Sequence, residues 1–355
     1  MDLKKITSIA LLITLVVGIQ LTTQLTGTSY YLTQLTMTMY SCLLIIGLCL
    51  VMGYAGQISL GHAGFFAIGG YTSAALTTTN LLEALERGSG CVGLLNKMGL
   101  LVSSTSLFGE PMLTVHPWLA CLLAIALTVL VAFAIGIPVL KLKGHYLAMA
   151  TLGFGIIIYR IVQPAPFLCE AAGISDVPGF TLLPGLTVNG DIGNRITNYY
   201  IAATILIIGF VLLLNLIDSR VGRALRAIHG AEDAADAMGI NTARYKLYTF
   251  VISAVFAAVA GILLTHYTGG ISPGDAGVMK SVRYVAIVAI GGMASLWGAL
   301  SMGGLLNFLS LRGFFGSYDD AFFGAILILI MLFAPQGILR LSLWNKFKGG
   351  KKEVQ

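Results

Sequence analysis

The sequence predicts an all-α integral membrane protein, and two features of its composition lead to this prediction. Hydrophobic residues make up 57% of the chain, charged residues only 10%, and the mean hydropathy is +0.89. Residues 6–82 contain no Asp, Glu, Lys or Arg. A soluble fold needs a solvated surface, so the expected solvent is lipid. The apolar runs lack the alternating ten-residue pattern of barrel strands, which leaves helices as the spanning elements.

Ten apolar segments qualify as candidate spans, since a helix needs about 20 apolar residues to cross about 30 Å of hydrocarbon. Two of them, 282–293 and 296–311, are short and glycine-rich, so we expect either ten crossings or eight plus a re-entrant pair. The first follows Lys4 and Lys5 without a signal-peptide cleavage pattern and is expected to be a span. The segments are 6–21, 32–52, 60–79, 117–139, 145–163, 199–216, 247–268, 282–293, 296–311 and 320–338.

The distribution of positive charge predicts the orientation. With both termini in the cytoplasm, 14 of the 21 Lys and Arg residues fall on the inner side, which is the bias that sets membrane topology. The net charge of +6 then reflects topology, and no nucleic-acid partner is expected.

We expect one permease-like domain over 1–340 and a basic cytoplasmic tail over 341–355. Its polar connections are two outer loops, 81–116 and 164–198, and one inner loop, 218–246. Cys91 and Cys169 both fall in outer loops, and the sequence leaves open whether they form a disulfide.

The inner loop is predicted to fold rather than only connect two spans. It holds nine charged side chains and is longer than a simple connection needs. Asp218 or Ser219 can cap a helix that Gly230 ends, and Glu232 with Asp233 suits the first turn of a second. The first helix would bury Val221, Leu225 and Ile228 on one face. Asn241 or Thr242 would cap the next span.

The chain lacks the devices that power active transport. It has no G-x-x-x-x-G-K-[ST] phosphate loop, and its predicted spans contain no buried Asp, Glu or Lys of the kind that ion-coupled transporters use. No catalytic residue, metal site or cofactor site is predicted, so we expect a transport subunit rather than an enzyme. A pump of this kind takes its force from a partner, and the inner loop is the expected docking surface. The alternative is a solvated connector that only enforces topology.

Two segments suggest an inverted internal repeat. Ala67–Ser73 (AIGGYTS) resembles Ala289–Ser295 (AIGGMAS), and the predicted topology runs them in opposite directions. Inverted repeats are common in transporters.

Several motifs together resemble one family. They are Gly53–Tyr71 (GYAGQISLGHAGFFAIGGY), Lys143–Gly155 (KGHYLAMATLGFG), Gly222–Ile228 (GRALRAI), Ala237–Ile240 (AMGI) and Ala334–Ile338 (APQGI). This set resembles the permeases of branched-chain amino acid ABC importers and of their urea and amide relatives. It is most similar to the larger of the two permease subunits that such systems pair.

The resemblance implies a bacterial inner-membrane importer with several partners. These are a second permease subunit forming a heterodimer, two cytoplasmic ATPase subunits, and a periplasmic or extracellular solute-binding protein. Asp233–Gly239 resembles the EAA-x-x-x-G coupling motif, with Asp in the Glu position. The residues expected to couple to the ATPase are Arg223, Arg226, Asp233, Ala234, Ala235 and Gly239. The chain departs from the family at His145 and Ile156, where acidic residues are usual, which puts the substrate in doubt.

A polar, glycine-bounded stretch is the candidate transport path. Gln57, Ser59 and His62 lie where glycines can interrupt a helix and expose backbone dipoles to a polar solute. Their alternative role is to hydrogen-bond neighbouring spans, and the same two roles are open to Thr151 and Gly153. Besides a branched-chain amino acid importer, the sequence leaves open a urea or amide importer, an autonomous channel or facilitator, and a scaffold that moves nothing.

Overall fold

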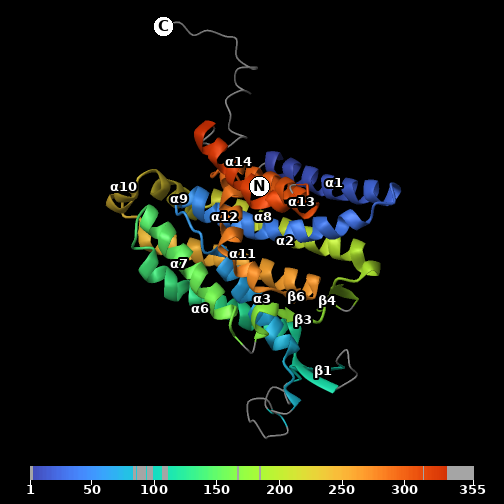
Figure 1. The fold of residues 1–355 in the computed structure, drawn as a ribbon. Coiled ribbons are helices and arrows are strands. Elements are labelled where there is room, and N and C mark those ends of the chain that lie inside the picture. Colours follow the sequence, from blue (N-terminus) through green and yellow to red (C-terminus); the bar gives the residue numbers. More distant parts are fainter. Residues whose placement is uncertain are drawn as a thin grey trace.

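The structure is a computed structural model, and it describes residues 3–333 apart from 83–84, 86–92, 94–98, 106–110, 166–167, 184 and 315. Cys91 and the predicted tail therefore lie outside the described residues. The rest forms a bundle of helices with short strands gathered at one end (Figure 1). We call this the strand end, and we call the opposite end, where α10 lies, the α10 end.

The helices follow the predicted segments closely. They are α1 (Leu3–Leu25), α2 (Tyr30–Cys49), α3 (His62–Thr78), α6 (Pro117–Val139), α7 (His145–Val162), α8 (Arg195–Asp218), α9 (Arg220–Gly230), α10 (Glu232–Ala237), α11 (Thr242–Thr268), α12 (Val278–Gly291), α13 (Leu296–Leu311) and α14 (Asp319–Phe333). A π-helix, η1 (Leu50–Tyr54), extends α2, and 3₁₀ turns occur at η3 (Glu170–Ala172), η4 (Ile192–Asn194), η5 (Pro273–Ala276) and η6 (Gly316–Tyr318).

Among the described residues, fewer helices than the ten predicted spans have the length and composition of a full membrane crossing. Among the described residues, six helices are long and apolar enough to cross a membrane. They are the helices at Thr7–Leu25, Tyr30–Tyr54, Pro117–Val139, His145–Val162, Ile192–Asp218 and Thr242–Thr268. The other predicted spans fall on α3, α12, α13 and α14, which have 17, 14, 16 and 15 residues, short of the usual length of about 20. The chain is a multi-pass membrane protein, and ten crossings are not confirmed.

Three two-stranded antiparallel pairs occupy the strand end. β1 (Leu101–Thr105) pairs with β2 (Pro111–Val115), β3 (Ile174–Ser175) with β6 (Gly270–Ile271), and β4 (Phe180–Leu183) with β5 (Leu186–Val188). The pairing of β3 with β6 attaches the predicted outer loop 164–198 to the segment after α11. The two ends of α11 thus lie beside α10 and beside β6 (Figure 1).

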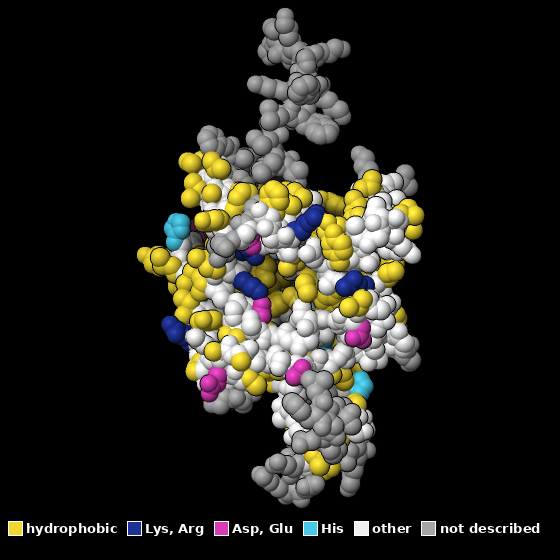
Figure 2. Space-filling view, turned by 45° about the vertical axis from the view of Figure 1, so that its right-hand side comes forward, with side chains coloured by type: hydrophobic (Ala, Val, Ile, Leu, Met, Phe, Trp, Pro, Cys, Tyr) yellow, Lys and Arg dark blue, Asp and Glu magenta, His cyan; other side chains and the backbone are white. Residues whose placement is uncertain are grey.

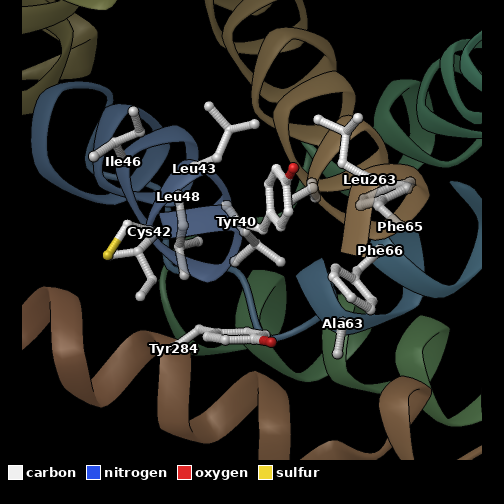
Figure 3. Close-up of a cluster of buried hydrophobic side chains, with 14 of the residues drawn as sticks. Tyr40, Cys42, Leu43, Ile46, Leu48, Ala63, Phe65, Phe66, Leu263 and Tyr284 are labelled. Carbon is white, nitrogen blue, oxygen red and sulfur yellow. The ribbon is translucent and has the colours of Figure 1, made fainter. Parts of the chain in front are cut away.

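The centre of the bundle is built by α2, α3 and α11. In the apolar stretch of α2 with η1, 83% of the residues are buried, against 28% in the corresponding stretches of α6 and of α7. α6 and α7 are therefore peripheral. Figure 3 shows Tyr40, Leu43 and Leu48 beside Phe65, Phe66 and Leu263 in this core. Small residues bring α3 and α11 close, because a Cβ on Gly261 would lie 2.1 Å from the Phe66 carbonyl oxygen. Close approach through glycine is how membrane helices gain packing contacts.

The two segments of the predicted repeat differ in local structure. Ala67–Ser73 is helical throughout α3, whereas its counterpart leaves the helix at Gly292, whose φ of +97° ends α12. The inverted repeat therefore stays a prediction.

Candidate functional site

The helix break between α2 and α3 lies against a second break, the turn between α12 and α13. Gly53 packs on the carbonyl of Met293, and a Cβ at Gly53 would lie 1.3 Å from that oxygen. The Cys49 thiol lies 3.5 Å from the same oxygen. Only glycine fits at position 53, so the residue type fixes how the end of η1 meets the turn between α12 and α13.

Ser59 and His62 make hydrogen bonds within the chain. His62 is buried at the start of α3; its Nδ1 lies 3.0 Å from the Ser59 hydroxyl and its Nε2 lies 2.7 Å from the Ser253 hydroxyl on α11. Both ring nitrogens therefore have partners within the chain. This arrangement ties the break to the central helix.

Gln57 differs from its neighbours because its amide has no partner. The residue is 2% exposed, yet neither Nε2 nor Oε1 makes a hydrogen bond within the described structure. Gln57 also lines a cavity of about 230 Å³ together with His229, Glu232 and Lys246. A buried amide without partners is costly, so this group is available to a polar molecule in the cavity.

Of the two predicted residues on α7, Thr151 contacts the break and Gly153 does not. The Thr151 hydroxyl accepts a hydrogen bond of 3.0 Å from the Leu60 backbone N–H, which joins α7 to the break. A Cβ on Gly153 would meet no atom within 4 Å. Of the five predicted path residues, the structure therefore brings four together and leaves Gly153 apart.

The predicted inner loop folds into two helices, as the sequence indicates. The Ser219 hydroxyl caps α9 by accepting a 3.1 Å hydrogen bond from the Val221 N–H. Leu225 and Ile228 are buried, while Arg223 and Arg226 are exposed. Asn241 caps α11, its side chain accepting from the Arg244 N–H at 3.1 Å.

Polar contacts of three acidic side chains, Glu232, Asp233 and Asp236, fasten α10 to the rest of the bundle. Lys143, between α6 and α7, donates to Asp233 at 3.0 Å, and this hydrogen bond raises the pKa of Lys143. The Thr242 hydroxyl donates to Asp236 at 3.1 Å. Lys246 pairs with Glu232.

The pairing of Lys246 with Glu232 shows that Lys246 is not a solvated loop lysine. Its side chain is only 8% exposed, because Glu232 from α10 reaches it near the start of α11. No local sequence signal identifies this pair, since both residues look like loop charges.

His266 is a second buried polar residue whose hydrogen bonds the sequence does not indicate. Its ring lies 2.8 Å from the Ser73 hydroxyl and 2.7 Å from the Pro178 carbonyl oxygen.

The residues predicted to couple to an ATPase are mostly exposed on α9 and α10. We call Arg223, Arg226, Asp233 and Ala234, with Met238 just after α10, the coupling surface, after that prediction. Met238 is 83% exposed, and the Asp233 side chain is 91% exposed. Ala235 faces inward and is buried, and Gly239, with φ of +82°, ends α10 and turns the chain toward α11. The surface projects from the α10 end of the bundle (Figure 1). Its charges and exposed methionine suit a protein partner, and its attachments would pass a displacement to α11.

Comparison with known proteins gives one family. The model of the family described as the permease component of branched-chain amino acid transport systems matches residues 30–331. Permease protein LivM of the high-affinity branched-chain amino acid transport system of Salmonella typhimurium is 31% identical over 86% of this chain and 69% of its own length. LivH of the same organism is 30% identical, as is BraD of Pseudomonas aeruginosa, each over 84% of this chain and 90% of its own length. No solved structure matches the chain.

Proposed function

This chain belongs to the family of permease components of branched-chain amino acid transport systems, and we propose that it is the membrane-spanning permease subunit of an ATP-driven importer. A solute-binding protein delivers branched-chain amino acids to it, and the subunit catalyses no covalent change. The solute passes as the assembly alternates between two accessible states, and differential binding of ATP by the partner shifts that equilibrium.

The observation that supports this function is the coupling surface. Its side chains are exposed at one end of the bundle, and α10 is fastened both to the α6–α7 connection through Lys143 and to α11 through Lys246. A cytoplasmic ATPase that moved α10 would therefore move α11 as well. We place the α10 end in the cytoplasm, in the bacterial inner membrane, in agreement with the bias of positive charge.

The proposed assembly contains a second permease subunit. Salmonella typhimurium has two permease proteins of one transport system, LivM and LivH, and this chain resembles both at about the same identity. A system with two related permeases favours a heterodimeric membrane core. Two ATPase subunits would then dock on the two coupling surfaces.

The test is a triple variant in which Arg223, Asp233 and Gly239 are replaced by alanine. In the complete transporter in liposomes, leucine uptake should be lost while ATP hydrolysis continues and the chain remains inserted. A variant with Lys141→Ala and Arg244→Ala removes exposed cations at the same end but outside α9 and α10, and should transport normally. Normal uptake by the triple variant would reject the role, and downhill flux through the purified chain alone would indicate a facilitator instead.

A further inference from the structure

A groove near the strand end has no role in the proposed function. It lies between α6, α8 and the hairpin of β4 and β5, and it has a volume of about 690 Å³. Sites that take a small molecule have volumes of about 300–1,000 Å³, so the groove is large enough for a ligand. It is lined by Trp118 of α6, by Leu182, Leu183 and Leu186 of the hairpin, and by residues of α8 from Ile196 to Ile205.

The lining of this groove suits hydrocarbon. None of the described residues that line it is charged, and its polar groups are the Trp118 indole N–H and the hydroxyls of Thr197, Tyr200 and Thr204. The Tyr200 hydroxyl already donates to Gln20 Oε1 on α1, at 3.2 Å. A charged ligand would lose its hydration in the groove without gaining a counter-charge, so an apolar ligand is favoured.

The face of α8 that lines the groove continues along the helix. α6 and α8 are both long and apolar enough to cross a membrane. Exposed residues recur at every fourth position of α8, at Ile196, Tyr200, Thr204, Ile208 and Leu212; the first three line the groove and the last two lie beyond it. Figure 2, in which the strand end comes forward, shows hydrophobic side chains exposed over much of the bundle and only scattered charged ones. The groove is thus continuous with a surface of a spanning helix that faces hydrocarbon.

Two aromatic residues place the groove in one leaflet. Trp118 is the second residue of α6, and Tyr200 lies in the second turn of α8. Trp and Tyr gather where hydrocarbon meets water, so the groove starts at that level. Residues 196–205 of α8 extend about 14 Å at about 1.5 Å per residue, which is about half of a hydrocarbon core of about 30 Å.

We propose that the groove binds one acyl chain of a phospholipid from the leaflet at the strand end. The chain lies along α8, and the leucines of the hairpin cover it. Leu183 and Leu186 are exposed in the chain alone, and exposed apolar patches of this kind mark interaction surfaces. A lipid at this place goes beyond the proposed function, since the site is separate from the break between α2 and α3.

Ring contacts connect this groove to the end of α11. The Phe180 ring of β4 lies 5.2 Å from the Trp118 ring and 5.4 Å from the His266 ring, centroid to centroid. The His266 ring also lies 2.7 Å from the Pro178 carbonyl oxygen. An acyl chain between Trp118 and the hairpin therefore supports the contact of the hairpin with α11, and lipid that occupies the groove should stabilise the folded chain.

The experiment uses the complete transporter in nanodiscs that contain an increasing fraction of phosphatidylethanolamine with a diazirine midway along one acyl chain. After illumination, mass spectrometry identifies the labelled positions. Labelling of the hairpin and of α8 between Ile196 and Ile205 should saturate at a low fraction of the probe. Labelling at Leu130, which is exposed on α6 and does not line the groove, should rise in proportion to the probe.

A variant with a matched control tests the groove itself. Thr204→Trp places an indole in the groove, so labelling of the hairpin should fall about tenfold, because displacing even two buried methylene groups weakens affinity by that much. Ile208→Trp adds the same ring one turn further on, on the same exposed face but outside the groove, and should leave labelling unchanged. Phosphatidylethanolamine added to the detergent-solubilised transporter should raise the melting temperature less in Thr204→Trp than in Ile208→Trp.

Other results overturn the site. Labelling that rises in proportion to the probe at every exposed position, or that is unchanged in Thr204→Trp, shows only the lipid that surrounds any membrane protein. Leu183→Cys, in a chain whose native cysteines are replaced, tests for a protein occupant: a thiol that a short bifunctional reagent cross-links to the second permease subunit or to the solute-binding protein in most complexes rejects the lipid. If Thr204→Trp fails to assemble, saturation and position of labelling on the unaltered chain decide.

Discussion

Two polar residues in the break between α2 and α3 are in opposite situations. His62 has both ring nitrogens hydrogen-bonded, whereas the Gln57 amide has no partner and lines a cavity. The sequence places both in one glycine-bounded stretch but does not separate their roles. The hydrogen-bond partner of His62 on α11, Ser253, lies 191 residues away from it in the chain, so the sequence does not show that His62 has a partner there.

This difference predicts opposite effects of substitution. Gln57→Leu removes an unpartnered buried amide, so the complex should melt at the same or a higher temperature while leucine uptake falls. His62→Ala removes two hydrogen bonds and leaves Ser253 unpaired, at a cost of about 1–3 kcal/mol, so its melting temperature should fall. Gln24→Leu, on exposed α1, is a matched control that removes an amide hydrogen-bonded to Gln20, outside the break. Full uptake by Gln57→Leu would exclude Gln57 from the transport path.

Among the helices, α10 and α11 depend on each other. α10 has six residues, too few for an isolated helix to be stable, so its attachments to Lys143 and Lys246 hold it in place. α11 has 27 residues, and at about 1.5 Å per residue it extends about 40 Å, from α10 to the strand end. There it supplies Leu264 and Thr268 to two cavities, of about 400 Å³ and about 130 Å³. One helix thus joins the coupling surface to the strand end.

The buried pair of Lys246 and Glu232 should carry this connection. Lys246→Glu places two carboxylates together, and breaking a buried pair costs about 3–5 kcal/mol, reduced here because Glu232 is 27% exposed. We expect a lower melting temperature and little uptake. The exchanged double variant Lys246→Glu with Glu232→Lys should recover both. Lys143→Glu breaks an exposed pair, so it should lower the melting temperature and the uptake less than Lys246→Glu does. Failure of the exchange to restore uptake would show that the pair is not the connection.

Across the whole molecule, the sequence predicts the helices better than it predicts their partners. The segments 117–139 and 296–311 coincide with α6 and α13, and the Ser219 and Asn241 caps are confirmed. These features depend on local patterns of apolar and capping residues. The family is also predicted correctly, because its motifs are continuous stretches of sequence.

Features that depend on distant contacts do not follow from the sequence. The helix predicted at 282–293 begins earlier, at Val278. Its cations Lys280 and Arg283 pair with Asp275 and Asp319, and the sequence pattern does not show this pairing. The pairing of β3 with β6 joins Ile174 to the distant Ile271. The ten crossings stay a prediction for a related reason: α12 and α13 are short helices, and the way each lies in the membrane depends on contacts with neighbouring helices that the sequence does not show.

Force is expected to enter the bundle through the coupling surface, from the cytoplasm. The direct measurement introduces Met238→Cys into a chain whose five native cysteines are replaced. The control is Ile192→Cys, at an exposed position of the strand end. The thiol at position 238 should react with a membrane-impermeant maleimide only in inside-out vesicles, whereas the thiol at position 192 should react only from the opposite side.

A short bifunctional thiol reagent then measures contact with the partner. In the active transporter, the thiol at position 238 should cross-link to the ATPase subunit, because Met238 lies on the coupling surface. Labelling of this thiol from outside the cell, or an active transporter in which it forms no cross-link to the ATPase, would contradict the proposed route of force.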